Sequence, residues 1–146
     1  MQLNFNNSSN LLVETKSKTY PVYIGEHVTN DLVPFLLTFS KKSTKICIVT
    51  DSQVADLYLA NLQQRIAESF QTYSYTIPSG EASKSFDQYY SLQTFLLENS
   101  FDRDSLILAF GGGVVGDLAG FVAATYMRGI RFVQVPTTLL AHDSAV

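Results

Sequence analysis

The sequence predicts an α/β domain with a doubly wound, mostly parallel sheet and helices on both faces. Short runs rich in β-branched residues alternate along the chain with longer runs of helical periodicity. Residues 45–50 and 105–110 are almost uninterrupted apolar runs, which is typical of strands buried on both faces of a parallel sheet. Such strand–helix–strand units are joined by right-handed crossovers.

Local signals indicate where the elements begin and end. Pro21 suits the start of an edge strand, and Pro34 fits only the first turn of a helix. Ser85 has capping-box spacing, while Arg128 and Gly129 supply a C-terminal charge and cap to the helix before them. The expected elements in chain order are strand 20–24, helix 31–39, strand 45–50, helix 52–70, strand 73–77, helix 85–99, strand 105–110, helix 111–127 and strand 131–135.

Composition narrows the class of protein. The 146 residues are 46% hydrophobic and 16% charged, which favours one domain with a packed core. Lys and Arg number 10 against 13 Asp and Glu, so clustered cations for general nucleic-acid binding are not expected. The single cysteine, Cys47, lies in an apolar strand and is expected to be a core thiol. With no membrane-length apolar run and no signal-peptide pattern, we expect a cytoplasmic protein without membrane or nucleic-acid partners.

Candidate functional residues follow the predicted strands. Ligands of such sheets bind at the carboxyl ends of the strands, near a topological switch point. Asp51 follows one strand, residues 79–84 follow the next, and the glycine-rich segment 111–117 follows the one after. That segment, GGGVVGD, contains G-x-G-x-x-G, in which glycines let backbone N–H groups approach a phosphate at a helix N-terminus. No Walker lysine follows, which argues against a P-loop nucleotide hydrolase.

Each of these signals also has a purely structural interpretation. The glycine segment could be a tight turn that packs a helix on the sheet, and it follows a late strand rather than the first one. Asp117, in the expected first helical turn, would complement the helix dipole. Glu81 and Lys84 are spaced for a local ion pair, and Thr137 with Thr138 would suit an N-cap. The two histidines lack metal-ligand spacing, so no metal site is expected in this chain.

Taken together, these segments resemble the 3-dehydroquinate synthase family. The resemblance lies in PSGE to KSF at residues 78–86, GGGVVGDLAGF at 111–121, AATYMRG at 123–129 and VQVPTTLLA at 133–141. It extends over essentially the whole chain but over only the N-terminal half or less of a family member.

The resemblance implies that residues 1–146 are a Rossmann-like, N-terminal NAD-binding domain, with the family's helical metal-binding domain absent from the sequence. It implies a carbon–oxygen lyase of the shikimate pathway that converts 3-deoxy-D-arabino-heptulosonate 7-phosphate to 3-dehydroquinate and phosphate. NAD would be used transiently, together with zinc or cobalt held by ligands downstream of Val146. The partners implied are a phosphorylated sugar acid and a second subunit in a homodimer.

The resemblance also assigns residues by position. Arg128 looks like the substrate-phosphate arginine that reaches the neighbouring subunit's site, and Asp143 looks like a substrate-pocket aspartate. No catalytic set is complete in this chain. The residues that look like NAD contacts are Asp51, Ser79, Gly80, Glu81, Lys84, Gly112, Gly113, Val114, Val115, Gly116, Asp117, Thr137, Thr138 and Leu140.

Other functions remain open at this point. One is a related sugar-phosphate cyclase such as a 2-deoxy-scyllo-inosose synthase, or a more distant metal-dependent alcohol dehydrogenase. Another, from a different class, is a non-catalytic nucleotide-binding module that keeps the glycine turn without the chemistry.

The 146-residue chain alone is expected to bind NAD weakly or not at all and to have no synthase activity, because the family's later lysines and metal ligands are absent from the sequence. Calorimetric titration with NAD and an assay for 3-dehydroquinate check this expectation. Measurable dehydroquinate formation by the isolated chain would contradict it.

Overall fold

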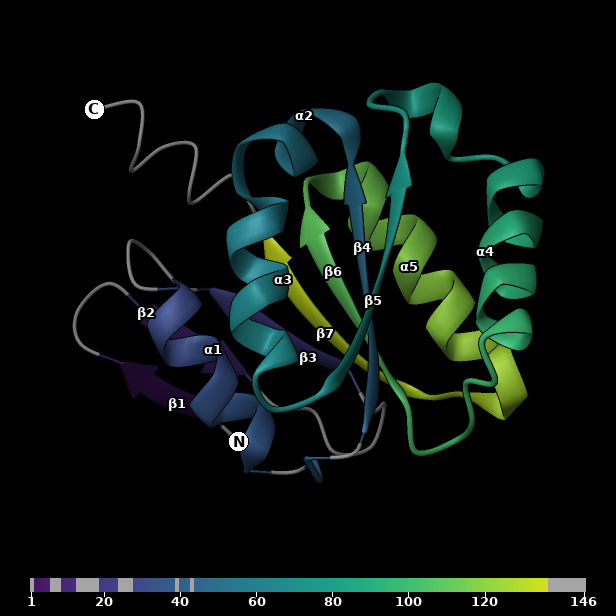
Figure 1. The fold of residues 1–146 in the computed structure, drawn as a ribbon. Helices are drawn as coiled ribbons and strands as arrows, with labels where there is room; N and C mark the ends of the chain where they lie inside the picture. The colour runs from purple at the N-terminus through teal and green to yellow at the C-terminus, as the bar shows by residue number, and fades with distance from the viewer. Residues whose placement is uncertain are drawn as a thin grey trace.

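The computed structural model describes residues 2–5, 9–12, 19–23, 28–38, 40–42 and 44–136. These described segments contain a seven-stranded sheet with the order β1-β2-β3-β7-β6-β4-β5 (Figure 1). The strands from β3 to β5 in this order pair in parallel, whereas β1, β2 and β3 pair antiparallel. The strands are β1 Gln2–Phe5, β2 Ser9–Leu12, β3 Thr19–Tyr23, β4 Lys45–Asp51, β5 Gln71–Ile77, β6 Leu106–Gly111 and β7 Arg131–Pro136.

The helices cover both faces of the sheet, which confirms the predicted doubly wound architecture (Figure 1). One apolar cluster joins α1 and α3 to side chains such as Ile48 and Leu108, and the other joins α4 and α5 to Val49 and Ile107. Alternate residues of β4 and β6 therefore enter opposite layers. The helical segments are α1 Val28–Leu37, α2 Ser52–Val54, the π-helical η2 Ala55–Leu59, α3 Ala60–Ala67, the 3₁₀ turn η3 Glu81–Ser83, α4 Phe86–Glu98, α5 Gly113–Thr125 and the 3₁₀ turn η4 Tyr126–Arg128.

The path of the chain reverses between β4 and β6. From β4 the chain passes through α3 on one face to β5, and it then returns through α4 on the other face to β6, on the opposite side of β4. The carboxyl ends of β4 and β6 are joined by the buried hydroxyl of Thr50, which donates to the carbonyl oxygen of Phe110 at 2.6 Å. This pair of strand ends is the switch point at which such sheets bind ligands.

Several local predictions are confirmed. Ser85 is the N-cap of α4, because its hydroxyl accepts a hydrogen bond from the N–H of Gln88 at 3.3 Å. Cys47 is fully buried in β4, and desolvation raises the pKa of its thiol, so it is a core thiol rather than a nucleophile. Gly129 has a φ of 110° and ends η4, as expected of a cap. Among the described helices, none has the length and apolar character needed to cross a membrane.

Other local predictions are wrong. Pro34 lies inside α1 rather than in its first turn, because the helix begins at Val28. The single helix expected at 52–70 is divided by the π-helical η2 and ends at Ala67, and the helix expected up to Met127 ends at Thr125. Strands β1 and β2 were not predicted, because their short sequences QLNF and SNLL contain no β-branched residues.

Ser100 is a favourable place for a stabilising substitution. It ends α4 in a Schellman motif with a φ of 59°, where its N–H donates to Leu97 and the Phe101 N–H donates to Leu96. This left-handed conformation costs a non-glycine residue about 1–2 kcal/mol, while glycine loses about 0.5–1 kcal/mol of additional entropy on folding. Ser100→Gly should therefore raise the free energy of unfolding by about 0.5 kcal/mol in urea denaturation. A lower value for the variant would contradict this account.

Candidate functional site

The loops after β4 and β5 are joined at the carboxyl edge of the sheet. Asp51 ends β4 and is the N-cap of α2, where its Oδ1 accepts the N–H of Val54 at 2.9 Å. The same Oδ1 accepts the hydroxyl of Ser79 at 3.0 Å, and the N–H of Ser79 donates to the Ser52 hydroxyl at 3.2 Å. The structure therefore joins Asp51 and Ser79, two predicted site residues, by a direct hydrogen bond. Ser52 adds a second contact to Ser79, and the sequence analysis missed it although it directly follows Asp51.

The glycine segment is the turn between β6 and α5, next to the end of β4. Gly112 is the N-cap of α5, and it has no side chain to accept hydrogen bonds from the first helical amides. The N–H of Gly116 donates to the Gly112 carbonyl at 3.0 Å. The preceding amides belong to Gly113, Val114 and Val115, which lie before the first helical hydrogen bond, and no side chain of the described residues caps them. Such amides are a favourable site for an anion.

The glycines of this turn serve two different purposes. A Cβ added to Gly111 would lie 2.7 Å from Cγ2 of Val115, and one added to Gly116 would lie 2.3 Å from Nε2 of Gln134 in β7. These two positions therefore permit close packing within the turn and of α5 on β7. A Cβ added to Gly112 or Gly113 would meet no atom of the described residues within 4 Å beyond the adjacent backbone. Packing does not explain those two glycines, whereas the close approach of a ligand to the backbone does.

Lys84 and Asp117 form an ion pair that the sequence analysis did not anticipate. Nζ of Lys84 lies 2.8 Å from Oδ2 of Asp117, and both side chains are half exposed or more. The hydrogen bond and charge of Asp117 raise the pKa of Lys84, and the charge of Glu81 adds to this effect. The local Glu81–Lys84 ion pair considered above is thus wrong, because Lys84 reaches α5 instead. Asp117 is the fifth residue of α5, beyond the first turn, so its interpretation as a dipole-complementing residue is also wrong.

An apolar pocket of about 270 Å³ lies beside this ion pair, between the starts of α4 and α5. Phe86 and Phe121 line it and remain 84% and 57% exposed. The rings of Tyr89 and Phe121 lie 4.8 Å apart between centroids. Sequence periodicity did not reveal this pocket, because these side chains occupy helix positions that face away from the core.

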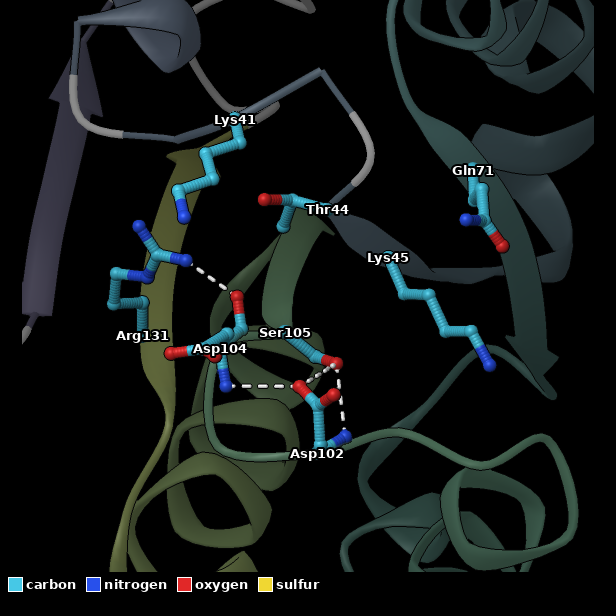
Figure 2. A pocket seen from close by; sticks show the side chains of 8 residues that line it. All are labelled: Lys41, Thr44, Lys45, Gln71, Asp102, Asp104, Ser105 and Arg131. Atoms are coloured by element: carbon cyan, nitrogen blue, oxygen red, sulfur yellow. Dashed lines mark hydrogen bonds between the residues drawn. The ribbon is translucent and has the colours of Figure 1, made fainter.

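A larger cavity, of about 510 Å³, lies at the opposite, amino edge of the sheet (Figure 2). Charged side chains in this cavity form hydrogen bonds with the surrounding loops. Lys45 donates to the carbonyl oxygen of Asn99 at 2.7 Å, and Arg131 donates to the Asp104 carbonyl oxygen and to the Ser40 hydroxyl. Despite its size, this cavity is far from the glycine turn and from the switch point. We therefore regard the carboxyl edge as the candidate site.

The remaining predicted residues do not all meet at this edge. Gly80 and Glu81 lie in the loop after β5, next to Ser79. Arg128 lies at the other end of α5, about 20 Å along the helix from the glycine turn. The structure therefore does not bring Arg128 to the candidate site of the same chain. Four predicted residues lie outside the described part of the chain, and they are Thr137, Thr138, Leu140 and Asp143.

Comparison with known proteins identifies the family. Residues 74–146 match the family model described as 3-dehydroquinate synthase N-terminal. The chain belongs to the 3-dehydroquinate synthase family. It is 56% identical over 136 residues to the 3-dehydroquinate synthase of Geobacillus kaustophilus and 52% identical over 134 residues to that of Bacillus cytotoxicus. Each match includes 92% of this chain, which spans only 37% and 36% of those two proteins.

A solved structure supports the same fold. The crystal structure of 2-deoxy-scyllo-inosose synthase complexed with carbaglucose-6-phosphate, NAD+ and Co2+ matches with a TM-score of 0.71 and 27% identity. The match includes 82% of this chain and 32% of that one. The family resemblance and the Rossmann-like fold expected from the sequence are thus confirmed for this N-terminal portion of the family.

The Lys84–Asp117 pair has a measurable titration signature. Asp117→Asn should lower the pKa of Lys84 toward its ordinary value, because both the hydrogen bond to a carboxylate and the negative charge are lost. NMR titration of the Lys84 side chain measures this change, and Glu81→Gln should give a smaller decrease because Glu81 acts through charge alone. An unchanged pKa in Asp117→Asn would show that the pair does not form in solution.

The raised pKa of Lys84 determines how the contribution of the ion pair to folding stability changes with pH. A raised pKa in the folded chain means that the pair's stabilisation is fully present below the ordinary lysine pKa of about 10.4. The stabilisation is lost as the pH rises through the higher pKa of the folded state.

Proposed function

We propose that this chain is the NAD-binding domain of a 3-dehydroquinate synthase. The complete protein would be a cytoplasmic carbon–oxygen lyase that converts 3-deoxy-D-arabino-heptulosonate 7-phosphate to 3-dehydroquinate and phosphate. One observation carries the proposal, namely the open glycine turn at the switch point. Gly112 and Gly113 leave space above uncapped helix amides, next to the Asp51 carboxylate. Family membership and the names of the two bacterial relatives support the specific activity.

The described residues at this edge fit NAD. The amides of Gly113, Val114 and Val115 would donate to the pyrophosphate, to which the helix N-terminus adds favourable partial charge. Val115 would act through its backbone alone, because its side chain is buried. Oδ1 of Asp51 accepts hydrogen bonds from Val54 and Ser79, whereas its other oxygen accepts none from the described residues and could accept ribose hydroxyls. A carboxylate at this place would repel the additional phosphate of NADP.

In the proposed reaction, bound NAD would accept and return a hydride. The role of this chain is to bind and orient that group against the substrate. Lys84 and Asp117 flank the turn on the side of α4, and the planar guanidinium of Arg128 suits bidentate binding of the substrate phosphate. Because Arg128 lies about 20 Å along α5 from the turn, we propose that it serves the site of a second copy in a homodimer.

The described residues do not fit a metal ion. They include no group of three or more His, Cys, Asp and Glu side chains that could hold one. We therefore place no step of the reaction on a metal bound by them. We propose that the zinc or cobalt ion implied by the resemblance is held by parts of the protein outside this chain, since the bacterial relatives are much longer than the chain.

A second candidate function is cyclisation of a different sugar phosphate, as favoured by the structural match to 2-deoxy-scyllo-inosose synthase. The identity to that protein is 27%, against 52–56% to the two bacterial 3-dehydroquinate synthases. The sequence similarity therefore favours the dehydroquinate reaction.

Gly113→Ala in the complete protein tests the proposal. Apart from its own chain neighbours and the adjacent helix backbone, the added methyl group meets no atom of the described residues within 4 Å, so the fold should be retained. The methyl group would enter the space in which the pyrophosphate approaches the amides, and loss of about one to two charged hydrogen bonds should weaken NAD binding about 10–100-fold. Calorimetric titration with NAD measures this change, and dehydroquinate formation should fall with it.

The matched control is Gln64→Ala, on the exposed side of α3. It should leave NAD affinity and activity unchanged. Unchanged NAD affinity in Gly113→Ala would contradict the proposed site.

A further inference from the structure

The segment after α5 has an unusual backbone. Met127, Arg128 and Gly129 have φ angles of 48°, 66° and 110°, so three consecutive residues lie in the left-handed region. Only the glycine adopts this region without a steric penalty. A run of this kind persists where the surrounding structure determines it strongly, and such strain is concentrated at functional sites.

Tyr126 fixes the start of this segment. The residue is 2% exposed, and its hydroxyl donates to the carbonyl oxygen of Phe101 at 2.7 Å. Its N–H donates to the Val122 carbonyl, and its own carbonyl accepts the N–H of Gly129 at 2.8 Å. The N–H of Ile130 then donates to Ala123 at 2.8 Å, which closes the turn from the other side.

The contacts of Arg128, at the tip of this turn, do not explain the strained backbone. Arg128 is exposed and forms no ion pair or hydrogen bond with the described residues. A guanidinium on a rigid backbone loses less conformational entropy when it binds an anion than one on a mobile loop. The turn therefore presents a cation outward in a fixed position.

We propose that Tyr126 is a positioning residue whose hydroxyl bond to Phe101 holds Arg128 for bidentate binding of the phosphate group of a phosphorylated sugar. The inference rests on the proposed function, in which Arg128 is the phosphate-binding residue. Tyr126 itself lies in the core and acts only through the turn that it anchors. The bond to Phe101 also ties the turn to the segment between α4 and β6, which a flexible arginine loop would not require.

Steady-state kinetics of Tyr126→Phe in the complete protein tests this inference. Loss of the hydroxyl should raise KM for the phosphorylated substrate about 3–10-fold with little change in kcat, because ground-state phosphate binding is weakened. A purely structural role would lower the thermal midpoint and leave KM unchanged. Tyr75→Phe is the matched control, because the Tyr75 hydroxyl in β5 forms no hydrogen bond within the described residues, and it should leave KM unchanged.

A double variant determines whether the effect passes through Arg128. Arg128→Ala alone should raise KM about 10–100-fold, and Tyr126→Phe should add nothing in that background. Two outcomes overturn the inference and leave the proposed function intact. In the first, Tyr126→Phe raises KM equally with and without Arg128. In the second, Arg128→Ala raises KM but Tyr126→Phe does not. No effect of Arg128→Ala on KM overturns both the inference and the proposed role of Arg128.

If the Tyr126→Phe variant does not fold, the Gly129→Ala variant is used for the same kinetic test. A side chain at a φ of 110° disturbs the same turn from its other end, and the same KM increase is expected. An unchanged KM in a folded Gly129→Ala protein overturns the inference.

Discussion

The parallel pairing of β4 with β6 is the constraint on which the candidate site depends. These strands are separated in sequence by β5, yet they lie side by side because the chain crosses from one face of the sheet to the other. The chain leaves β4 toward α3 on one face and leaves β6 toward α5 on the other face, so none of the described helices lies above the two strand ends. The buried hydrogen bond from Thr50 to the carbonyl oxygen of Phe110 fixes how the ends of the two strands are aligned. Asp51 and the glycine turn are therefore held at one edge by the core, rather than by contacts with each other.

The glycine turn shows how packing and binding share one short sequence. Gly111 and Gly116 lie against neighbouring side chains, Val115 and Gln134, and so permit close packing, although the end of the Gln134 side chain could move to admit a Cβ. Gly112 and Gly113 have open space instead, and the helix amides beside them lack a cap. A domain under selection for stability alone would gain from a capping side chain at Gly112, since such caps stabilise a helix by about 1 kcal/mol. The helix thus forgoes the stability of a cap, and its amides stay accessible to a phosphate.

Sequence reasoning predicted the elements whose apolar periodicity is strong, including both buried strands and the glycine-led helix. It missed β1 and β2, whose short sequences lack β-branched residues. It placed Asp51 and Ser79 in one site, because parallel strands end at the same edge, but it did not predict the hydrogen bond between them. The partner of Lys84 was also missed, since the choice of Asp117 over Glu81 depends on how α4 packs beside α5. Long-range side-chain pairing of this kind requires tertiary geometry.

The central claim is that NAD binds at the carboxyl edge through the amides at the start of α5. Hydrogen–deuterium exchange of the complete protein, with and without saturating NAD, tests this claim directly because uncapped amides exchange readily and become protected when they bind a phosphate. We expect NAD to slow exchange in the peptide spanning residues 111–117 and to leave exchange in the amino-edge peptide spanning residues 102–105 unchanged. Protection at the amino edge, with none at the glycine turn, would contradict it.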